Sequence, residues 1–332
     1  MKDFAGKTAF ITGGASGAGF GQAQIFSEAG MKVVIADVRQ DHIDEAMAYF
    51  KQTGAPVHAI NLDVMDRDAY KAAADETERV YGSAPDLLVL TAGVNTFGPP
   101  EASTFEDFDW VTGVNLGGVI NGLVTFVPRI IKSGKKGYVA VTASYSVFGA
   151  SPICAPYGAS KAAVFSLMES YFISLKPYGI GVSVLCPANV KSRIYEAAIK
   201  TRPERLKNSG YNANEATQAF LAETHQFGIE PRDLAGWLKR GIENEVFLIV
   251  PYEHAEQMVE QAMSRYVDYL TPEGMKRLEE KQKGPPTEEE LKLIAEREGY
   301  EIKPGESIVS RSDVGFGKAR SDLDWVDAGK RA

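Results

Sequence analysis

Residues 8–19 read TAFITGGASGAG, and this stretch decides the fold. Its first five residues are apolar or β-branched, which predicts a short buried strand. Glycines follow at positions 13, 14, 17 and 19, and residues 21–29 have the length of a helix. Glycine lets the backbone approach a phosphate closely, and the amides and dipole at the start of a helix attract negative charge. The stretch therefore predicts a strand, a phosphate-binding turn and a helix in succession.

The alternation of strand and helix continues along the chain. Further short apolar or β-branched runs occupy residues 32–37, 57–63, 87–91, 138–142, 181–186 and 247–250. Segments of helical length and spacing occupy residues 43–52, 67–81, 105–133 and 160–177. Strands this apolar are expected to be buried on both faces, which requires helices above and below the sheet. The pattern predicts an α/β protein with a doubly wound, Rossmann-type parallel sheet of seven strands.

The character of the sequence changes after about residue 252. Residues 253–270 have the spacing of one more helix, and residues 287–298 predict a charged helix that opens on a capping box. We expect a main domain at residues 1–270 and a C-terminal extension at residues 271–332. The extension cannot build its own core. It is expected to dock on the main domain or on a neighbouring subunit, or else to be mobile; its candidate anchors are Ile302, Ile308, Val309, Phe316, Trp325 and Val326.

Composition excludes several classes of protein. The chain of 332 residues is 44% hydrophobic, enough for a full core, and its net charge of −8 argues against nucleic acid or anionic lipid as a partner. No apolar run approaches the ~20 residues that cross a bilayer, and the first strand begins too early for a signal peptide, so we expect a cytoplasmic protein. Cys154 and Cys186 are expected to be buried, reduced thiols. The four histidines have no metal-ligand spacing, so we expect no metal.

A possible proton-transfer group lies in the second half of the chain. Thirteen residues separate Ser144 from Tyr157, and Lys161 follows four residues later. Positions four apart share one face of a helix, so the Lys161 ammonium can lie near the Tyr157 phenol. Such a pair is usually structural when it occurs alone. Here it shares the chain with a nucleotide-binding turn, which favours a catalytic interpretation.

These motifs together resemble those of the short-chain dehydrogenase/reductase family, over about residues 4–252. The family pattern consists of a TGxxxGxG turn, an internal Asn, a Ser and a YxxxK segment. The matching residues are Gly13, Gly17, Gly19, Asn115, Ser144, Tyr157 and Lys161. Residues 13–23, 121–129 and 178–184 are further similar to the branch that holds bacterial Cα-dehydrogenases of lignin-type aryl ethers and 20β-hydroxysteroid dehydrogenases.

Asp37 indicates which nucleotide the turn binds. It ends the second predicted strand, where a carboxylate accepts hydrogen bonds from the adenosine ribose and repels a 2′-phosphate. We therefore expect NAD(H). Arg39 leaves NADP(H) as an alternative, because a guanidinium two residues further on could pair with that phosphate. Ser16 favours NAD(H), since it occupies a position where phosphate-binding relatives often carry a basic residue.

The resemblance implies further contacts with the cofactor. It assigns Asp63 and Val64 to the adenine ring, although Asp63 could instead be a carboxylate that caps a helix. Three positions depart from the family pattern: Thr91 replaces an Asn, Ala188 replaces a Gly, and Ser192 replaces a Thr. The remaining implied contacts are Ser16, Ala92, Gly93, Tyr157, Lys161, Pro187, Val190 and Ser192.

The expected chemistry interconverts a secondary alcohol and a ketone, with Tyr157 as general acid or base. Lys161 and the nicotinamide should stabilise its phenolate, and Ser144 should hold the substrate oxygen. By family resemblance, Asn115 anchors a relay of water and backbone to Lys161. Residues 191–230 form the expected substrate lid. Four aromatic residues suit a bulky apolar substrate such as a steroid alcohol or an aryl-alkyl carbinol, although each alone could be core packing: Phe97, Tyr145, Phe148 and Tyr195.

Two other functions remain open from the sequence. An NAD-binding scaffold with an idle catalytic pair would be expected to lose Tyr157 or Lys161, and both are present. A sugar-nucleotide epimerase usually needs a larger substrate domain. The family resemblance further implies a homodimer or a homotetramer.

Overall fold

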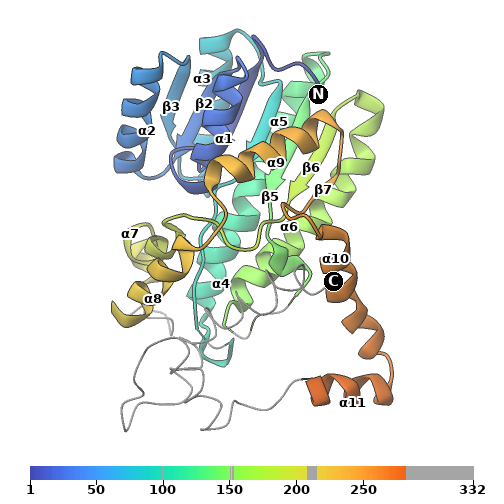
Figure 1. Cartoon of the computed structure of the whole chain (residues 1–332). Coiled ribbons are helices and arrows are strands. Elements are labelled where there is room, and N and C mark those ends of the chain that lie inside the picture. The colour runs from blue at the N-terminus through green and yellow to red at the C-terminus, as the bar shows by residue number, and fades with distance from the viewer. Residues whose placement is uncertain (99, 150, 152, 208–214, 282–332) are drawn as a thin grey trace. The chain divides into compact units, whose positions relative to one another are not determined.

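The computed structural model describes residues 1–98, 100–149, 151, 153–207 and 215–281 of the chain (Figure 1). Its backbone divides into two compact units. The first unit comprises residues 1–214 and 225–251, and the described part of the second comprises residues 215–224 and 252–281. All the candidate site residues belong to the first unit.

The first unit is built on a sheet of seven parallel strands in the order β3-β2-β1-β4-β5-β6-β7, which confirms the predicted fold. The order reverses direction between β1 and β4. Such a reversal opens a crevice at the carboxyl ends of the strands, and α/β proteins bind their ligands there. The strands are β1 (Thr8–Thr12), β2 (Lys32–Asp37), β3 (Val57–Asn61), β4 (Leu87–Leu90), β5 (Tyr138–Thr142), β6 (Gly181–Leu185) and β7 (Leu248–Ile249).

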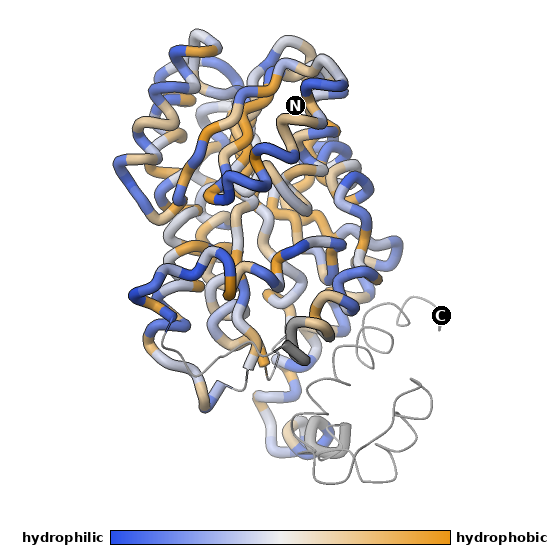
Figure 2. The backbone as a smooth tube through the Cα atoms, turned by 90° about the vertical axis from the view of Figure 1, so that its left-hand side faces the viewer, coloured by the Kyte–Doolittle hydropathy of each residue, from blue (hydrophilic) through white to orange (hydrophobic). Residues whose placement is uncertain are grey.

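Helices cover both faces of this sheet. On one face, Ile11 and Ile35 pack in a core cluster with side chains of α1, α2 and α9. On the other face, the ring of Phe10 lies 4.5 Å from that of Phe126 in α5. Figure 2 shows the hydrophobic stretches along the strands and the hydrophilic ones on outer helices. The first unit's helices are α1 (Gly17–Glu28), α2 (Gln40–Thr53), α3 (Arg67–Tyr81), α4 (Phe105–Thr112), α5 (Gly118–Lys132), α6 (Ala155–Ser174), α7 (Ala197–Lys200) and α9 (Pro231–Glu243).

The segment predicted as one helix over residues 105–133 is interrupted. A π-helical turn, Gly113–Gly117, joins α4 to α5 and contains Asn115. Such turns insert one residue into the regular hydrogen-bond ladder and often occur at functional sites. The composite stretch Phe105–Lys132 is long and apolar enough to span a membrane, but 44% of its most apolar window is buried in the protein. The stretch departs from the expectation that no apolar run approaches the length of a membrane span, but one such helix is weak evidence for a membrane.

Shorter elements occupy the loops, and the second unit is helical. Single 3₁₀ turns lie at Pro100–Ala102, Tyr145–Val147, Lys176–Tyr178, Ile194–Glu196 and Glu204–Leu206. Helix α8 (Glu215–Gln226) spans the boundary between the units. The helix expected over residues 253–270 is observed as α10 (Ala255–Asp268), and α11 (Pro272–Lys281) follows it. Arg277 of α11 pairs with Asp268 at 2.8 Å.

Several expectations lie outside the described residues. They include the charged helix at residues 287–298 and all six proposed anchors of the extension. The boundary at residue 270 stays a prediction.

Cys186 is buried and Cys154 only partly so, and both thiols are free. Within the described ranges, no three His, Cys, Asp or Glu side chains gather as a ligand set for a metal ion.

Candidate active site

The glycine turn forms where β1 ends and α1 begins. Gly13 has a φ of +64°, and a Cβ atom there would lie 2.8 Å from the Cα of Ala92. A Cβ atom on Gly19 would lie 2.1 Å from the carbonyl oxygen of Gly13. Ser16 precedes α1 in an extended conformation, and its side chain makes no capping hydrogen bond. The first amides of α1 are therefore not capped by that side chain, which suits a bound pyrophosphate.

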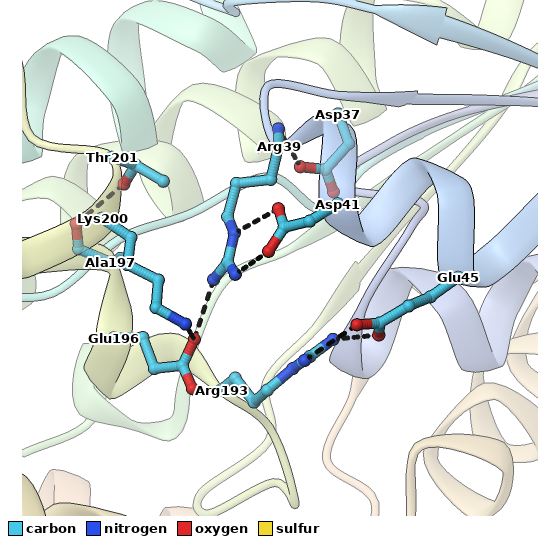
Figure 3. A network of polar contacts seen from close by, with 9 residues as sticks. All are labelled: Asp37, Arg39, Asp41, Glu45, Arg193, Glu196, Ala197, Lys200 and Thr201. Carbon is cyan, nitrogen blue, oxygen red and sulfur yellow. Dashed lines mark hydrogen bonds and ion pairs between the residues drawn. The ribbon is translucent and has the colours of Figure 1, made fainter.

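Asp37 lies next to this turn at the end of β2. Its carboxylate accepts hydrogen bonds from the backbone amides of Arg39 at 3.1 Å and Ala15 at 3.4 Å. The side chain is 9% exposed, and burial raises the pKa of its carboxyl group. The position fits the predicted role at the adenosine ribose. The Arg39 side chain, which left NADP(H) open, is paired with Asp41 and Glu196 (Figure 3).

Asp63 and Val64 follow β3, which ends at Asn61 rather than at residue 63. Asp63 is exposed and accepts a hydrogen bond from the amide of Met65 at 2.9 Å. Helix α3 is capped instead by Asp66, so Asp63 does not have the alternative role of a helix cap. Val64 is buried, and its carbonyl accepts a hydrogen bond from Asn121 of α5 at 2.9 Å. Contact of either residue with adenine stays a prediction.

Thr91, the departure from the family's Asn, belongs to a polar cluster at the end of the sheet. Its hydroxyl lies 2.8 Å from that of Thr142 and donates to the side-chain oxygen of Gln22 at 2.7 Å. Gln22 is fully buried and in turn donates to Thr142 at 3.2 Å. The sequence analysis did not identify Gln22, since one polar residue in a small-residue helix gives no distinct signal. The cluster fixes the turn that carries Ala92 and Gly93.

The Asn115 side chain links neighbouring segments through three hydrogen bonds. Its oxygen accepts from the amide of Val94 at 2.8 Å, and its nitrogen donates to the carbonyl of Val94 and to Ser160, both at 3.0 Å. The side chain is fully buried. These bonds join the π turn, the loop after β4 and α6. The side-chain amide therefore holds the helix that carries Tyr157 and Lys161 against the sheet, and the proposed relay through Asn115 stays a prediction.

Close to Asn115 lie the three other predicted catalytic residues, Ser144, Tyr157 and Lys161. Helix α6 begins at Ala155, earlier than predicted, so Tyr157 and Lys161 both lie on it. The Lys161 ammonium donates to the carbonyl of Thr142 at 2.9 Å and lies 5.6 Å from the centroid of the Tyr157 ring. Ser144 hydrogen-bonds to Tyr157. A Cβ atom on Gly93 would lie 3.4 Å from the Lys161 nitrogen, so the turn after β4 reaches the same group.

The acidity of these groups differs from the expectation. Burial raises the pKa of Tyr157 to about 12, and the hydrogen bond from Ser144 only partly offsets this. Burial also lowers the pKa of Lys161 to about 8. Desolvation outweighs the hydrogen bond from Ser144, and stabilisation of the phenolate by Lys161 together with a bound nicotinamide stays a prediction. The positive charge of an oxidised nicotinamide would add to that of Lys161.

Replacing Lys161 with Met is expected to abolish activity yet stabilise the fold at pH 7. The folded pKa of about 8 lies below the ordinary 10.5, so the charge is costly below pH 8 and the cost disappears as pH rises to 10.5. We expect a gain of up to about 2 kcal/mol in the free energy of unfolding, allowing for the lost bond to Thr142. Urea unfolding at several pH values measures it. A gain that does not shrink between pH 8 and 10.5 would contradict this account.

An apolar cluster borders Tyr157 on the side of the expected lid. It joins α4 to the first part of the lid, and its buried members are Val94, Trp110, Val111, Ala197 and Leu206, with Tyr157 packed against them. Tyr145 and Phe148 are buried, with ring centroids 5.5 Å apart, and Phe148 also makes an edge-to-face contact with Phe165. These two rings are core packing rather than open substrate contacts. Phe97 and Tyr195 are partly exposed.

A buried ion pair holds the lid to α4. Arg202 and Asp107 lie 2.8 Å apart with side chains 3% and 0% exposed. Asp107 also accepts from the amide and hydroxyl of Thr104, at 2.9 and 3.2 Å, and Arg202 lies over the ring of Trp110. The two partners lie far apart in sequence, so spacing alone could not predict this pair. The predicted lid residues 208–214 lie outside the described ranges, and residues 215–224 belong to the second unit.

Strand order, glycine turn and the Tyr157–Lys161 helix together define a nucleotide-dependent oxidoreductase. A model of the short chain dehydrogenase family matches residues 7–203. A Cα-dehydrogenase of Sphingobium sp. strain SYK-6 is 51% identical over 272 residues, which cover 82% of this chain and 89% of the relative. The chain therefore belongs to the short-chain dehydrogenase family, as the sequence predicted. It is an NAD-dependent oxidoreductase that acts on CH–OH groups.

Solved structures agree with this assignment. The apo form of LigD from Sphingobium sp. strain SYK-6 is 44% identical with a TM-score of 0.68, and the match covers 81% of this chain and 100% of that one. A short-chain dehydrogenase/reductase from Burkholderia phymatum, solved in complex with NAD, is 30% identical with a TM-score of 0.73. That match covers 81% of this chain and 96% of the other.

Proposed function

We propose that the protein interconverts a bulky secondary alcohol and its ketone, with Tyr157 as the general acid and base. The observation that carries this proposal is the convergence of Ser144, Tyr157 and Lys161 on α6 and the end of β5. These groups lie at the carboxyl ends of the strands, where the glycine turn is also found. A proton-transfer group and a nucleotide turn at one sheet edge suit hydride chemistry.

The proposed steps balance in both directions. When bound, the nicotinamide ring accepts or supplies the hydride at the substrate carbon. In oxidation, the Tyr157 oxygen takes the hydroxyl proton while Ser144 holds the same substrate oxygen. In reduction, the Tyr157 phenol returns a proton to that oxygen. Lys161 favours the phenolate form through its charge, and Asn115 holds α6 in position through its bonds to Val94 and Ser160.

An aryl-alkyl carbinol is the substrate class that we favour. The relative with 51% identity is a Cα-dehydrogenase. In this chain, the apolar cluster of Trp110, Val111, Ala197 and Leu206 adjoins Tyr157 and suits an aromatic or otherwise bulky group. A steroid alcohol is the second candidate, because the same apolar surroundings would accept it.

The test is a screen of NAD⁺ reduction over aryl-alkyl carbinols, steroid alcohols and simple secondary alcohols. We expect turnover with the aryl-alkyl carbinols. The kcat/KM for small aliphatic alcohols should be lower than that for the carbinols. Turnover of a sugar nucleotide without net NAD⁺ reduction would favour an epimerase. Tight NAD⁺ binding with no turnover of any alcohol or ketone would favour a scaffold and contradict the proposal.

We also propose that the protein is a cytoplasmic homodimer or homotetramer. Free thiols at Cys154 and Cys186 suit a reducing compartment. Helices α4, α5 and α6 expose large apolar side chains, including Phe105 at 87%, Val124 at 64% and Ile173 at 72%. Such surfaces usually contact a partner, here a second copy of the chain. Light scattering should give a mass of at least two chains, and a monomer at micromolar concentration would contradict this expectation.

A further inference from the structure

The segment of residues 192–200 runs from the glycine turn to the loop after β2. At one end, a Cβ atom on Gly17 would lie 2.9 Å from that of Ser192. Next to Ser192, Arg193 pairs with Glu45 of α2 at 2.7 Å, and further along the segment Glu196 pairs with Arg39 at 2.9 Å (Figure 3). The segment therefore touches both the phosphate-binding turn and the region proposed for the adenosine ribose.

Arg39 is the only group that the sequence analysis offered to a 2′-phosphate, and its guanidinium is already occupied. One edge faces Asp41, whose carboxylate takes two of its nitrogens, and the remaining terminal nitrogen donates to Glu196. The Arg39 side chain is only 10% exposed. A guanidinium has five donors in a fixed plane, so a phosphate could bind it well only by displacing one of these carboxylates.

The two carboxylates bind Arg39 differently. Asp41 accepts from two guanidinium nitrogens and contributes most to the raised pKa of Arg39, whereas Glu196 accepts from one nitrogen and joins Arg39 to the 192–200 segment. Asp41 lies two residues away, and its side chain is 59% exposed. Glu196 is 20% exposed and also accepts from Lys200 at 2.8 Å. The bonds from Lys200 and Arg39 outweigh burial and keep the pKa of Glu196 below its ordinary value, so the group is an anion at neutral pH.

We propose that Glu196 determines cofactor specificity by withdrawing Arg39 from a 2′-phosphate. The proposal rests on the assignment of Asp37 to the adenosine ribose. Asp37 repels the phosphate, and Glu196 holds the cation that could compensate. Binding NADP(H) would require Arg39 to exchange Glu196 for the phosphate, which would release the 192–200 segment from the loop after β2. NAD(H) lacks that phosphate and leaves the pair intact.

The test is the binding of NADH and NADPH to the full-length protein, followed by nucleotide fluorescence and calorimetry. Glu196→Gln should strengthen NADPH binding about tenfold and change NADH binding less than about twofold. Glu45→Gln is the matched control, because it removes one negative charge from the neighbouring Arg193 pair and leaves Arg39 untouched. It should change the ratio of the two affinities less than about twofold.

One double variant tests whether the gain depends on Arg39. Arg39→Ala combined with Glu196→Gln should abolish the gain, because the gain passes through the guanidinium. An unchanged affinity ratio in Glu196→Gln, an equal effect of Glu45→Gln, or a gain that survives the loss of Arg39 would each overturn the proposal.

Asp37→Ala separates this inference from the site assignment on which it rests. The expected result is weaker NADH binding. If NADH binding survives in Asp37→Ala while Glu196→Gln still favours NADPH, the assignment of Asp37 is wrong and the role of Glu196 stands. If Asp37→Ala weakens NADH binding while Glu196→Gln alters neither affinity, the role of Glu196 is wrong and the assignment stands.

Discussion

Replacing Tyr157 with Phe is expected to lower turnover by at least about 100-fold, since it removes the phenol oxygen that we propose as the general acid and base. The phenol bonds to Ser144, and the Lys161 ammonium lies 5.6 Å from its ring. The change keeps the ring and its packing against the apolar cluster. NADH affinity should therefore remain within about threefold, with the loss confined to kcat for both oxidation and reduction.

Tyr171→Phe is the matched control for this variant. It makes the same chemical change on the same helix, at a position away from Ser144 and Lys161. Its activity should equal that of the wild type. Near-normal turnover in Tyr157→Phe, or an equal loss in Tyr171→Phe, would end the proposed mechanism.

The fold could be predicted because its signals are local. The central strands β1, β4 and β5 are buried along their whole length, so their apolar composition marks them in the sequence, and the glycine turn marks the first crossover. The predicted end of β3 was wrong, because the chain there turns into a loop next to the candidate site. β3 ends at Asn61, two residues early, because Asp63 and Asp66 turn the chain into α3.

The candidate site could be predicted only where its residues follow a fixed spacing. Tyr157 and Lys161 share a helical face, and the glycines of the turn stand close in sequence. The π turn at Asn115 was not predicted, because residues 105–133 were interpreted as one regular helix. The pairing of Arg39 with Glu196 could not be predicted either, because the two residues lie 157 positions apart in sequence. Ion pairs of this kind form where two loops meet in the fold, and they leave no regular spacing in the sequence from which they could be predicted.

Substrate contacts were the least predictable part. Aromatic residues near a site can either line it or fill the core beneath it, and sequence does not distinguish the two. Tyr145 and Phe148 proved to be buried neighbours whose rings meet edge to face. The apolar surface next to Tyr157 instead comes from α4 and the lid, which are held together by Arg202 and Asp107.

Replacing Arg202 with Ala is expected to lower the free energy of unfolding by about 3 kcal/mol or more. The change leaves the fully buried Asp107 carboxylate with only its bonds to Thr104, and it uncovers the ring of Trp110. Burying an unpaired charge costs more than the pair itself contributes. Urea unfolding of the full-length protein measures the loss.

Two variants decide whether the unpaired charge is the cause. Arg232→Ala breaks a surface pair with Glu28, whose partners are 47% and 50% exposed, and should change stability by less than about 1 kcal/mol. Combining Arg202→Ala with Asp107→Asn removes both charges without restoring packing over Trp110 and keeps a side-chain cap for α4, so it should be more stable than Arg202→Ala alone. A double variant that is no more stable than Arg202→Ala would show that lost packing over Trp110, rather than the unpaired Asp107 carboxylate, accounts for the instability.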